Sequence, residues 1–368
     1  MKKILICASR VSHILNFHLP YIQYFKNRGY IVDIAVQGMT DHPLIDHCYD
    51  MRFTKNPLSP DNLRTIRQLR QLIVVNGYDM MYSNSTLAGA AARLAVKGMK
   101  QRPYCIHISH GYMFKEHGGL KSRVYLYAEK LTKNVTDDLI VMNREDWTLA
   151  RKYQLGKKIH YIYGMGLDEE KFPVISQKEK KRIRHSMNIS DSDKMLLCVG
   201  EFSDRKNQTA IITALNDLVK IHKNIMLVLA GEGNTLESCR QLVHEYELDR
   251  YVRFRGQVQD TAPLYRCSDL LVTAAKMEGL PFNVMEALYC GVPVVASSVK
   301  GHADLIRNGE NGLLTDHLLQ SLDRILSDSA LYEKLKANAF LDEKYLLKNA
   351  QPALLKILDR EYREEITV

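Results

Sequence analysis

Two glutamates, Glu278 and Glu286, carry the clearest chemical signal in the sequence. They stand in MEGLPFNVMEALYCG, residues 277–291. The apolar run at residues 270–273 indicates a buried strand, and the helical pattern that follows the turn ends at Gly291. A helix that begins where a strand ends leaves its first N–H groups free to bind an anion such as a diphosphate. The turn and the start of this helix comprise Gly279, Leu280, Pro281 and Phe282, with the proline suited to the first helical position.

The spacing of the two carboxylates suits a ligand with two sugar ends. Glu286 lies at most about 12 Å beyond Glu278 along the helix axis, at about 1.5 Å per residue. Two carboxylates at that separation can accept hydroxyl hydrogen bonds from both sugars of a nucleotide-sugar. Alternatively, Glu286 is a solvated helix residue and Glu278 interacts only with the helix dipole. The turn, glycine and helix start around the pair favour the nucleotide-sugar interpretation.

Cations and glycines follow two further apolar runs. Arg205 and Lys206 stand in the loop after residues 194–200, where they could neutralise a diphosphate or could simply be exposed to solvent. Gly231 and Gly233 follow the next run, where they would let a nucleotide approach the backbone or would form a tight turn.

A histidine stands at the end of another predicted strand. His110 follows the run at residues 104–109, where it could donate a hydrogen bond to a sugar hydroxyl, take part in proton transfer, or serve as a cap or core residue. A metal site built from His107, His110 and His117 lacks a carboxylate or thiolate to complete it. We therefore expect no metal and no cofactor.

The order of strand and helix patterns predicts an α/β fold with two domains. Apolar runs short enough for buried parallel strands alternate with helical periodicity, and the series restarts after the basic segment at residues 176–185, which we interpret as a linker. We expect an N-terminal Rossmann-like domain at residues 1–170 and a C-terminal one at residues 171–347. A last helix, at about 348–368, is expected to pack back on the first domain. Ligands of such paired sheets bind at the carboxyl ends of the strands, so we expect a cleft between the domains.

Charge is unevenly distributed along the 368 residues. Residues 1–165 hold 24 Lys and Arg against 12 Asp and Glu, a balance of +12, whereas the remainder carries −3. The first half could therefore face nucleic acid, an anionic membrane or a phosphorylated substrate, or could merely be a soluble basic surface. Seven scattered cysteines without a CxxC pair argue against a disulfide framework.

Together these motifs resemble retaining glycosyltransferases of family 4, whose hallmark is E-x7-E in an EG(F/L)P-x4-E setting. The resemblance covers nearly the whole chain and includes GEFSDRKN at residues 200–207, LAGEG at 229–233 and GVPVVAS at 291–297. It implies the GT-B fold, in which two Rossmann-like domains have parallel sheets that face a central cleft. It also implies that the C-terminal domain binds the nucleotide-sugar and the N-terminal domain binds the acceptor.

The resemblance assigns roles residue by residue. It implies that Glu278 contacts the transferred sugar and Glu286 the ribose, and that Lys206 binds the diphosphate. His110, in a segment similar to the family's HGF motif, would point at the donor sugar. The expected catalytic residues are His110, Glu278 and Lys206. The expected donor-binding residues are Arg205, Gly231, Gly233, Gly279, Leu280, Pro281, Phe282 and Glu286.

Some positions depart from the family pattern. Glu201 stands where many members have arginine and Asn207 where they have glycine, a form that looks more like polysaccharide-cluster members. SRVSH at residues 9–13 replaces a glycine-rich loop, and a helical segment is expected at residues 115–133. The candidate acceptor or membrane contacts, each of which could equally be an ordinary surface residue, are Arg10, His13, Lys115, Lys121 and Arg123, with His18 as a further acceptor-side candidate.

The resemblance implies a retaining hexosyl- or N-acetylhexosaminyltransferase that moves a sugar from a UDP-sugar to a lipid-linked glycan. The expected acceptor is an undecaprenyl diphosphate-linked glycan of capsule, exopolysaccharide or O-antigen biosynthesis. The enzyme is expected in the cytoplasm, peripherally associated with the anionic inner face of the cytoplasmic membrane.

Two other functions remain open at this stage. A UDP-sugar 2-epimerase has the same double-Rossmann plan but needs no acceptor, and the EGLP-x4-E form argues against it. A non-catalytic binder of nucleic acid or another anionic surface would use the same positive charge. No nucleic-acid recognition motif is visible, so we expect no nucleic-acid partner.

Overall fold

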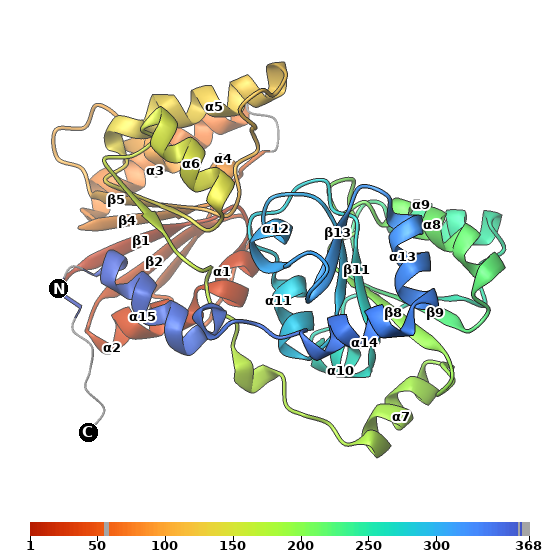
Figure 1. Ribbon diagram of the computed structural model, residues 1–368. Helices are drawn as coiled ribbons and strands as arrows, with labels where there is room; N and C mark the ends of the chain where they lie inside the picture. The colour runs from red at the N-terminus through yellow and green to blue at the C-terminus, as the bar shows by residue number, and fades with distance from the viewer. Residues whose placement is uncertain (55–58, 360, 363–368) are drawn as a thin grey trace. The chain divides into compact units, whose positions relative to one another are not determined.

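The computed structural model describes residues 1–54, 59–359 and 361–362 (Figure 1). The chain divides into two compact units. The N-terminal unit comprises Met1–Gly166 together with the segment from Lys348 onward, and the C-terminal unit comprises Leu167–Leu347. Each unit is built around its own parallel sheet, in the manner of an α/β protein.

The N-terminal unit contains a seven-stranded parallel sheet in the order β3-β2-β1-β4-β5-β6-β7. Its strands are β1 (Lys3–Cys7), β2 (Ile31–Val36), β3 (His47–Asp50), β4 (Met80–Asn84), β5 (Tyr104–Ser109), β6 (Asp138–Val141) and β7 (Lys158–Tyr161). Its helices are α1 (Val11–Phe17), α2 (Leu19–Asn27), α3 (Pro60–Asn76), α4 (Thr86–Val96), α5 (Leu120–Thr132), η1 (Lys133–Val135), α6 (Arg144–Tyr153) and, from the end of the chain, α15 (Leu347–Leu358).

Helices cover both faces of this sheet, with α3, α4 and α5 on one side and α2 and α15 on the other (Figure 1). The central strands β1, β4 and β5 are accordingly almost entirely buried, although β4 and β5 also contain serine, asparagine and histidine. The last helix packs back through polar contacts as well. Gln351 Nε2 donates to the carbonyl of Pro20 at 3.1 Å, and the Tyr24 hydroxyl donates to Asp359 Oδ2 at 2.9 Å.

The C-terminal unit contains a six-stranded parallel sheet in the order β10-β9-β8-β11-β12-β13. Its strands are β8 (Lys194–Val199), β9 (Ile225–Ala230), β10 (Val252–Phe254), β11 (Leu270–Thr273), β12 (Val294–Ser297) and β13 (Gly312–Thr315). Its helices are η2 (Glu169–Lys171), α7 (Gln177–Ser186), α8 (Gln208–Ile221), α9 (Leu236–Glu245), α10 (Ala262–Cys267), α11 (Phe282–Tyr289), α12 (His302–Leu305), α13 (Leu318–Ser327), α14 (Ser329–Ala337) and η3 (Glu343–Tyr345). β8 and β11 are neighbours at the centre, so the loops after them emerge side by side.

The basic segment predicted as a linker is instead helix α7. Ser176 caps it by accepting from the backbone N–H of Glu179 at 3.1 Å, which is half of a capping box. Arg184 is buried and donates to the carbonyl of Cys267 at 3.0 Å and to Asp269 Oδ2 at 3.1 Å. The linker prediction was wrong because a helix that buries one arginine shows almost no apolar periodicity.

Three helix boundaries also differ from expectation. The sequence pattern predicts one helix from about residue 16 to Arg28; the structure has α2 from Leu19 to Asn27, and a separate helix, α1, precedes it and ends at the break at His18. The helical segment predicted at residues 115–133 begins only at Leu120, so Lys115 precedes it. Pro281 has extended backbone angles and caps α11, which begins one residue later, at Phe282. Within the described residues, no helix combines the length and apolar character needed to cross a bilayer.

Candidate active site

The loop before α11 brings a carboxylate and two cations together in the C-terminal unit. Glu278 follows β11, and its carboxylate is only 8% exposed. Lys206 Nζ lies 2.7 Å from Glu278 Oε1, and Arg205 Nη1 lies 3.0 Å from Glu278 Oε2. The structure therefore brings these three sequence-predicted residues together. The Lys206 side chain is 14% exposed and that of Arg205 is 39% exposed, so the arginine is the more solvated partner.

The charges around Glu278 favour its ionised form. Burial by itself would raise the pKa of this carboxyl, but Lys206 and then Arg205 outweigh burial and lower the pKa below its ordinary value. Arg205 Nη1 also donates to the carbonyl of Met277 at 3.0 Å, which holds the arginine against the loop. The result is a fixed cluster of one anion and two cations at the carboxyl edge of the sheet.

The start of α11 is fastened to the neighbouring strand. Asn283 Nδ2 donates to the carbonyl of Val199, at the end of β8, at 3.0 Å. On the other side, a Cβ at Gly301 would lie 2.5 Å from the carbonyl oxygen of Gly279, so the two loops touch backbone to backbone. Gly279, Leu280, Pro281 and Phe282 are thereby held in one rigid turn beside the charged cluster.

Glu286 lies on the next turns of α11. Burial raises the pKa of this carboxyl, whereas the Tyr265 hydroxyl and Lys206 oppose the increase. The net direction is upward, opposite to that of Glu278. The two glutamates of the motif thus occupy distinct electrostatic environments, and only Glu278 is paired with cations.

At Gly231 and Gly233 the chain is closely approached by another backbone segment of the protein itself. Gly231 has φ +140°, and a Cβ there would lie 2.1 Å from the carbonyl oxygen of Gly200. Gly233 has φ +154°, and its Cβ would meet the carbonyl oxygen of Phe202 at 2.1 Å. The loops after β8 and β9 therefore stack directly on each other. A nucleotide contact at these glycines stays a prediction.

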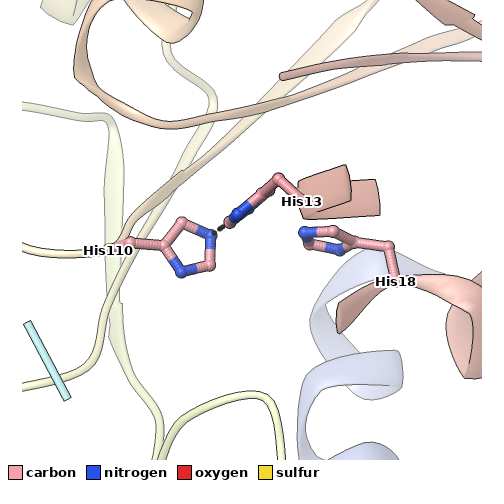
Figure 2. A group of neighbouring side chains, drawn as sticks. All are labelled: His13, His18 and His110. Carbon is pink, nitrogen blue, oxygen red and sulfur yellow. Dashed lines mark hydrogen bonds between the residues drawn. The ribbon is translucent and has the colours of Figure 1, made fainter. Parts of the chain in front are cut away.

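In the N-terminal unit, His110 joins a cluster of histidines at the end of β5. His110 Nε2 lies 3.2 Å from His13 Nε2 and 3.1 Å from Asn84 Oδ1. The rings of His13, His18 and His110 converge (Figure 2). Burial lowers the pKa of each, to about 4 for His13, so all three imidazoles are neutral near pH 7.

The metal-ligand set weighed from the sequence is not the set that the structure brings together. His107 is buried against Ser83, with its Nδ1 3.1 Å from the Ser83 hydroxyl, and a Cβ at Gly89 would overlap its ring. His117 is exposed. Sequence reasoning missed the convergence of His13 and His18, because residues five apart do not lie on the same face of one helix. The break between α1 and α2 at His18 changes the direction of the chain and brings the two rings together.

The remaining sequence-predicted residues lie at the surface. Arg10 caps α1 and is exposed, as are Lys115, Lys121 and Arg123. Helix α5 carries an unusual feature beside them. Four of its side chains that lie three or four residues apart, and so share one face, are exposed and apolar. These are Leu120, Val124, Tyr127 and Leu131.

Comparison with known proteins identifies the family. A family model described as glycosyl transferases group 1 matches residues 179–342, and one described as glycosyl transferase 4-like matches residues 3–143. EpsD of Bacillus subtilis, a protein named as a glycosyltransferase, is 32% identical over 316 residues, which cover 85% of this chain and 83% of EpsD. The chain belongs to glycosyltransferase family 4.

Some relatives of this family 4 glycosyltransferase are named for O-antigen biosynthesis, such as WbnH of Escherichia coli, which is 26% identical over 298 residues that cover 80% of each chain. An Escherichia coli protein named UDP-Gal:alpha-D-GlcNAc-diphosphoundecaprenol alpha-1,3-galactosyltransferase is 25% identical over 81% of each chain. The solved structure of Anabaena HepE in complex with UDP and glucose matches with a TM-score of 0.77 at 18% identity, covering 97% of this chain and 99% of HepE. The predicted GT-B fold class, with two parallel-sheet α/β domains, is confirmed by this likeness.

Proposed function

We propose that this glycosyltransferase moves a sugar from a UDP-sugar to a hydroxyl of an undecaprenyl diphosphate-linked glycan, with retention at the anomeric carbon. In this proposal the C-terminal unit binds the donor and the N-terminal unit binds the acceptor. The UDP bound in HepE supports the choice of nucleotide, and the name of the E. coli relative supports a lipid-linked acceptor. The proposed pathway is capsule, exopolysaccharide or O-antigen assembly.

The observation that carries the proposal is the cluster of Glu278, Lys206 and Arg205 beside the start of α11. Two cations next to the positive end of a helix suit a diphosphate, because both stabilise the charge that develops as the sugar–phosphate bond breaks. When the diphosphate binds Lys206 and Arg205 in place of Glu278, the Glu278 carboxylate can accept hydrogen bonds from the sugar hydroxyls. Glu286 accepts from the ribose in the same complex.

Catalysis in this account is positional and electrostatic. The bond between the anomeric carbon and the diphosphate oxygen breaks, and its electron pair leaves with UDP. The acceptor oxygen forms its bond on the same face and gives its proton to the departing diphosphate, so the configuration is retained. Glu278 orients the sugar without attacking it, and His110 donates a hydrogen bond to a sugar hydroxyl.

The membrane part of the proposal rests on α5. Its exposed apolar stripe, Leu120, Val124, Tyr127 and Leu131, is accompanied by Lys121 and Arg123. Apolar side chains that insert between lipids, next to cations that attract anionic headgroups, are typical of helices lying at a membrane surface. We place the enzyme in the cytoplasm with this helix against the membrane, where a lipid-linked acceptor is found.

A transfer assay tests the proposal. The purified full chain is incubated with a panel of UDP-sugars, with and without a polyprenyl diphosphate-linked sugar, and UDP release and product are measured. We expect UDP release only when the acceptor is present, and a product whose anomeric linkage has the same configuration, axial or equatorial, as the donor. The Glu278→Gln variant should lose this activity. Conversion of a UDP-sugar without acceptor would indicate an epimerase instead. A product of inverted configuration would refute retention.

A further inference from the structure

Three imidazoles from two separate parts of the N-terminal unit meet at one point. His13 and His18 come from α1 and the break after it, and His110 follows β5 (Figure 2). One ring nitrogen of each lies within 4.8 Å of the others. His13 Nε2 and His110 Nε2 are hydrogen-bonded to each other at 3.2 Å, and within the described part of the chain no carboxylate or thiolate belongs to this group.

The separation of His13 Nε2 and His110 Nε2 fits two ligands of one metal ion. With zinc–nitrogen bonds of about 2.05 Å, the 3.2 Å between these atoms corresponds to an angle of about 103° at the ion, close to the tetrahedral value. Ligands of a tetrahedral zinc lie about 3.3 Å apart. His18, whose ligand nitrogen is at most 4.8 Å from the others, would close in by at most about 1.5 Å.

His18 is oriented as metal-binding histidines are. Its Nδ1 is hydrogen-bonded to the Tyr82 hydroxyl, which leaves Nε2 as the nitrogen that turns toward His13 and His110 (Figure 2). Histidine ligands usually hold their second nitrogen in such a bond, which fixes ring orientation and tautomer. The residue is fully buried, and its Nε2 has no hydrogen-bond partner. A buried unsatisfied nitrogen destabilises the folded state unless a ligand takes it up.

We propose that His13, His18 and His110 bind a single divalent transition-metal ion, for which Zn²⁺ is the best match. Neutral imidazoles are the form that coordinates metal, and three of them leave a fourth position for water or a substrate oxygen. His110 Nε2 would exchange its 3.1 Å hydrogen bond with the carboxamide oxygen of Asn84 for the bond to the ion. Hard cations such as Mg²⁺ prefer oxygen ligands and are not expected here.

Metal binding has a consequence that rests on the proposed function. If His110 donates a hydrogen bond to the donor sugar, an ion on its Nε2 removes that hydrogen bond. Zn²⁺ would then slow sugar transfer, and a chelator would restore it. The binding proposal itself does not depend on this effect and is tested without substrate.

Binding is measured on the chelator-treated full chain, with Zn²⁺ by calorimetry and with Co²⁺ by visible absorption. We expect one equivalent to bind, a tetrahedral Co²⁺ spectrum without a thiolate band, and displacement of Co²⁺ by Zn²⁺. His13→Asn and His110→Asn, which alter half-buried side chains, should each weaken binding by more than the about 10- to 100-fold that is typical of losing an outer-shell partner. His117→Asn, an exposed histidine outside the cluster, is the matched control and should bind as the wild type does.

Other outcomes would overturn the proposal. They are the absence of one-equivalent binding, binding that survives both substitutions, and a thiolate band that assigns the ion to cysteines. Because a variant could fail to fold, the wild type supplies an independent measurement. Of the signals of its 13 histidines, Zn²⁺ should shift those of three in a histidine-selective NMR spectrum. Shifts confined to other histidines would refute the assignment.

Discussion

Lys206 Nζ lies 2.7 Å from Glu278 Oε1, so the cation in the loop after β8 is paired with the carboxylate in the loop before α11. The pair crosses the centre of the C-terminal sheet, because β8 and β11 are adjacent. In the proposed reaction each partner exchanges this contact for one with the donor. The ion pair therefore holds the two side chains that we propose to be catalytic in place before substrate arrives.

Replacing Lys206 with alanine should cost more activity than stability. The loss of a charge that stabilises the departing diphosphate is expected to lower kcat by about 10²- to 10³-fold. Arg205 still partners Glu278, so the loss in unfolding free energy should stay below the about 3–5 kcal/mol typical of a broken buried pair. Donor turnover and urea unfolding measure the two effects. Turnover within twofold of the wild type would contradict the assigned role.

Gly231→Ala should disrupt the loop stack. Its Cβ would lie 2.1 Å from the carbonyl oxygen of Gly200, so one backbone must move. Gly309→Ala is the matched control, since Gly309 also has a positive φ, +77°, but nothing within 4 Å of a Cβ. The control should lose about 1 kcal/mol from backbone strain alone. Gly231→Ala should lose clearly more in urea unfolding, and equal losses would refute the stacking argument.

Removing the apolar stripe of α5 should weaken membrane binding. Leu120 and Tyr127 are 80% and 62% exposed, so a Leu120→Ser/Tyr127→Ser variant loses little packing. Sedimentation with vesicles containing phosphatidylglycerol should show reduced binding, whereas neutral vesicles should bind poorly throughout. Ile221→Ser changes an exposed apolar residue of the C-terminal unit and serves as control. Equal binding by all three proteins would refute membrane docking through α5.

Donor affinity should fall on acidification because of Glu286. Its pKa lies above the ordinary 4.5, since burial disfavours the charged form. The ionised carboxylate is the better hydrogen-bond acceptor for ribose hydroxyls, so affinity is lost as the pH falls through this raised pKa. Calorimetry with UDP-glucose, whose phosphates stay singly ionised from pH 5 to 8, gives the profile. Glu286→Gln should flatten it; an unchanged profile in that variant would assign the titration elsewhere.

Local patterns predicted the donor-side elements correctly. The strand before Glu278 and the helix after Pro281 are set by short-range signals: an apolar run, a glycine turn and a proline at the helix start. Glu278 pairs with Lys206 because β8 and β11 are neighbours in the sheet. The sequence predicts both strands but does not specify that they are neighbours. The sign of the pKa shift of each glutamate required the burial and the neighbours.

Other features depend on contacts far apart in the chain. His13 meets His110 across 97 positions, and no periodicity links them. Helix α7, by contrast, could have been predicted from local signals. Ser176 and Glu179 form the S-x-x-E pattern of a capped helix start, and the lysine, arginine and glutamine residues that follow Ser176 favour helices. Charge alone suggested solvent exposure, whereas Arg184 is buried through its hydrogen bonds.

The central claim is that the C-terminal unit binds a UDP-sugar through the motif that contains Glu286. Thermal unfolding of the full chain with UDP, GDP and ADP, in the wild type and in Glu286→Ala, tests it most directly. At a concentration of about 100 Kd, UDP should stabilise the wild type by about 2.7 kcal/mol and raise Tm by several degrees. Glu286→Ala should lose this shift, while Glu237→Ala, which alters an exposed glutamate of α9, should keep it. A wild type that no nucleotide stabilises, or an undiminished UDP shift in Glu286→Ala, would contradict the account.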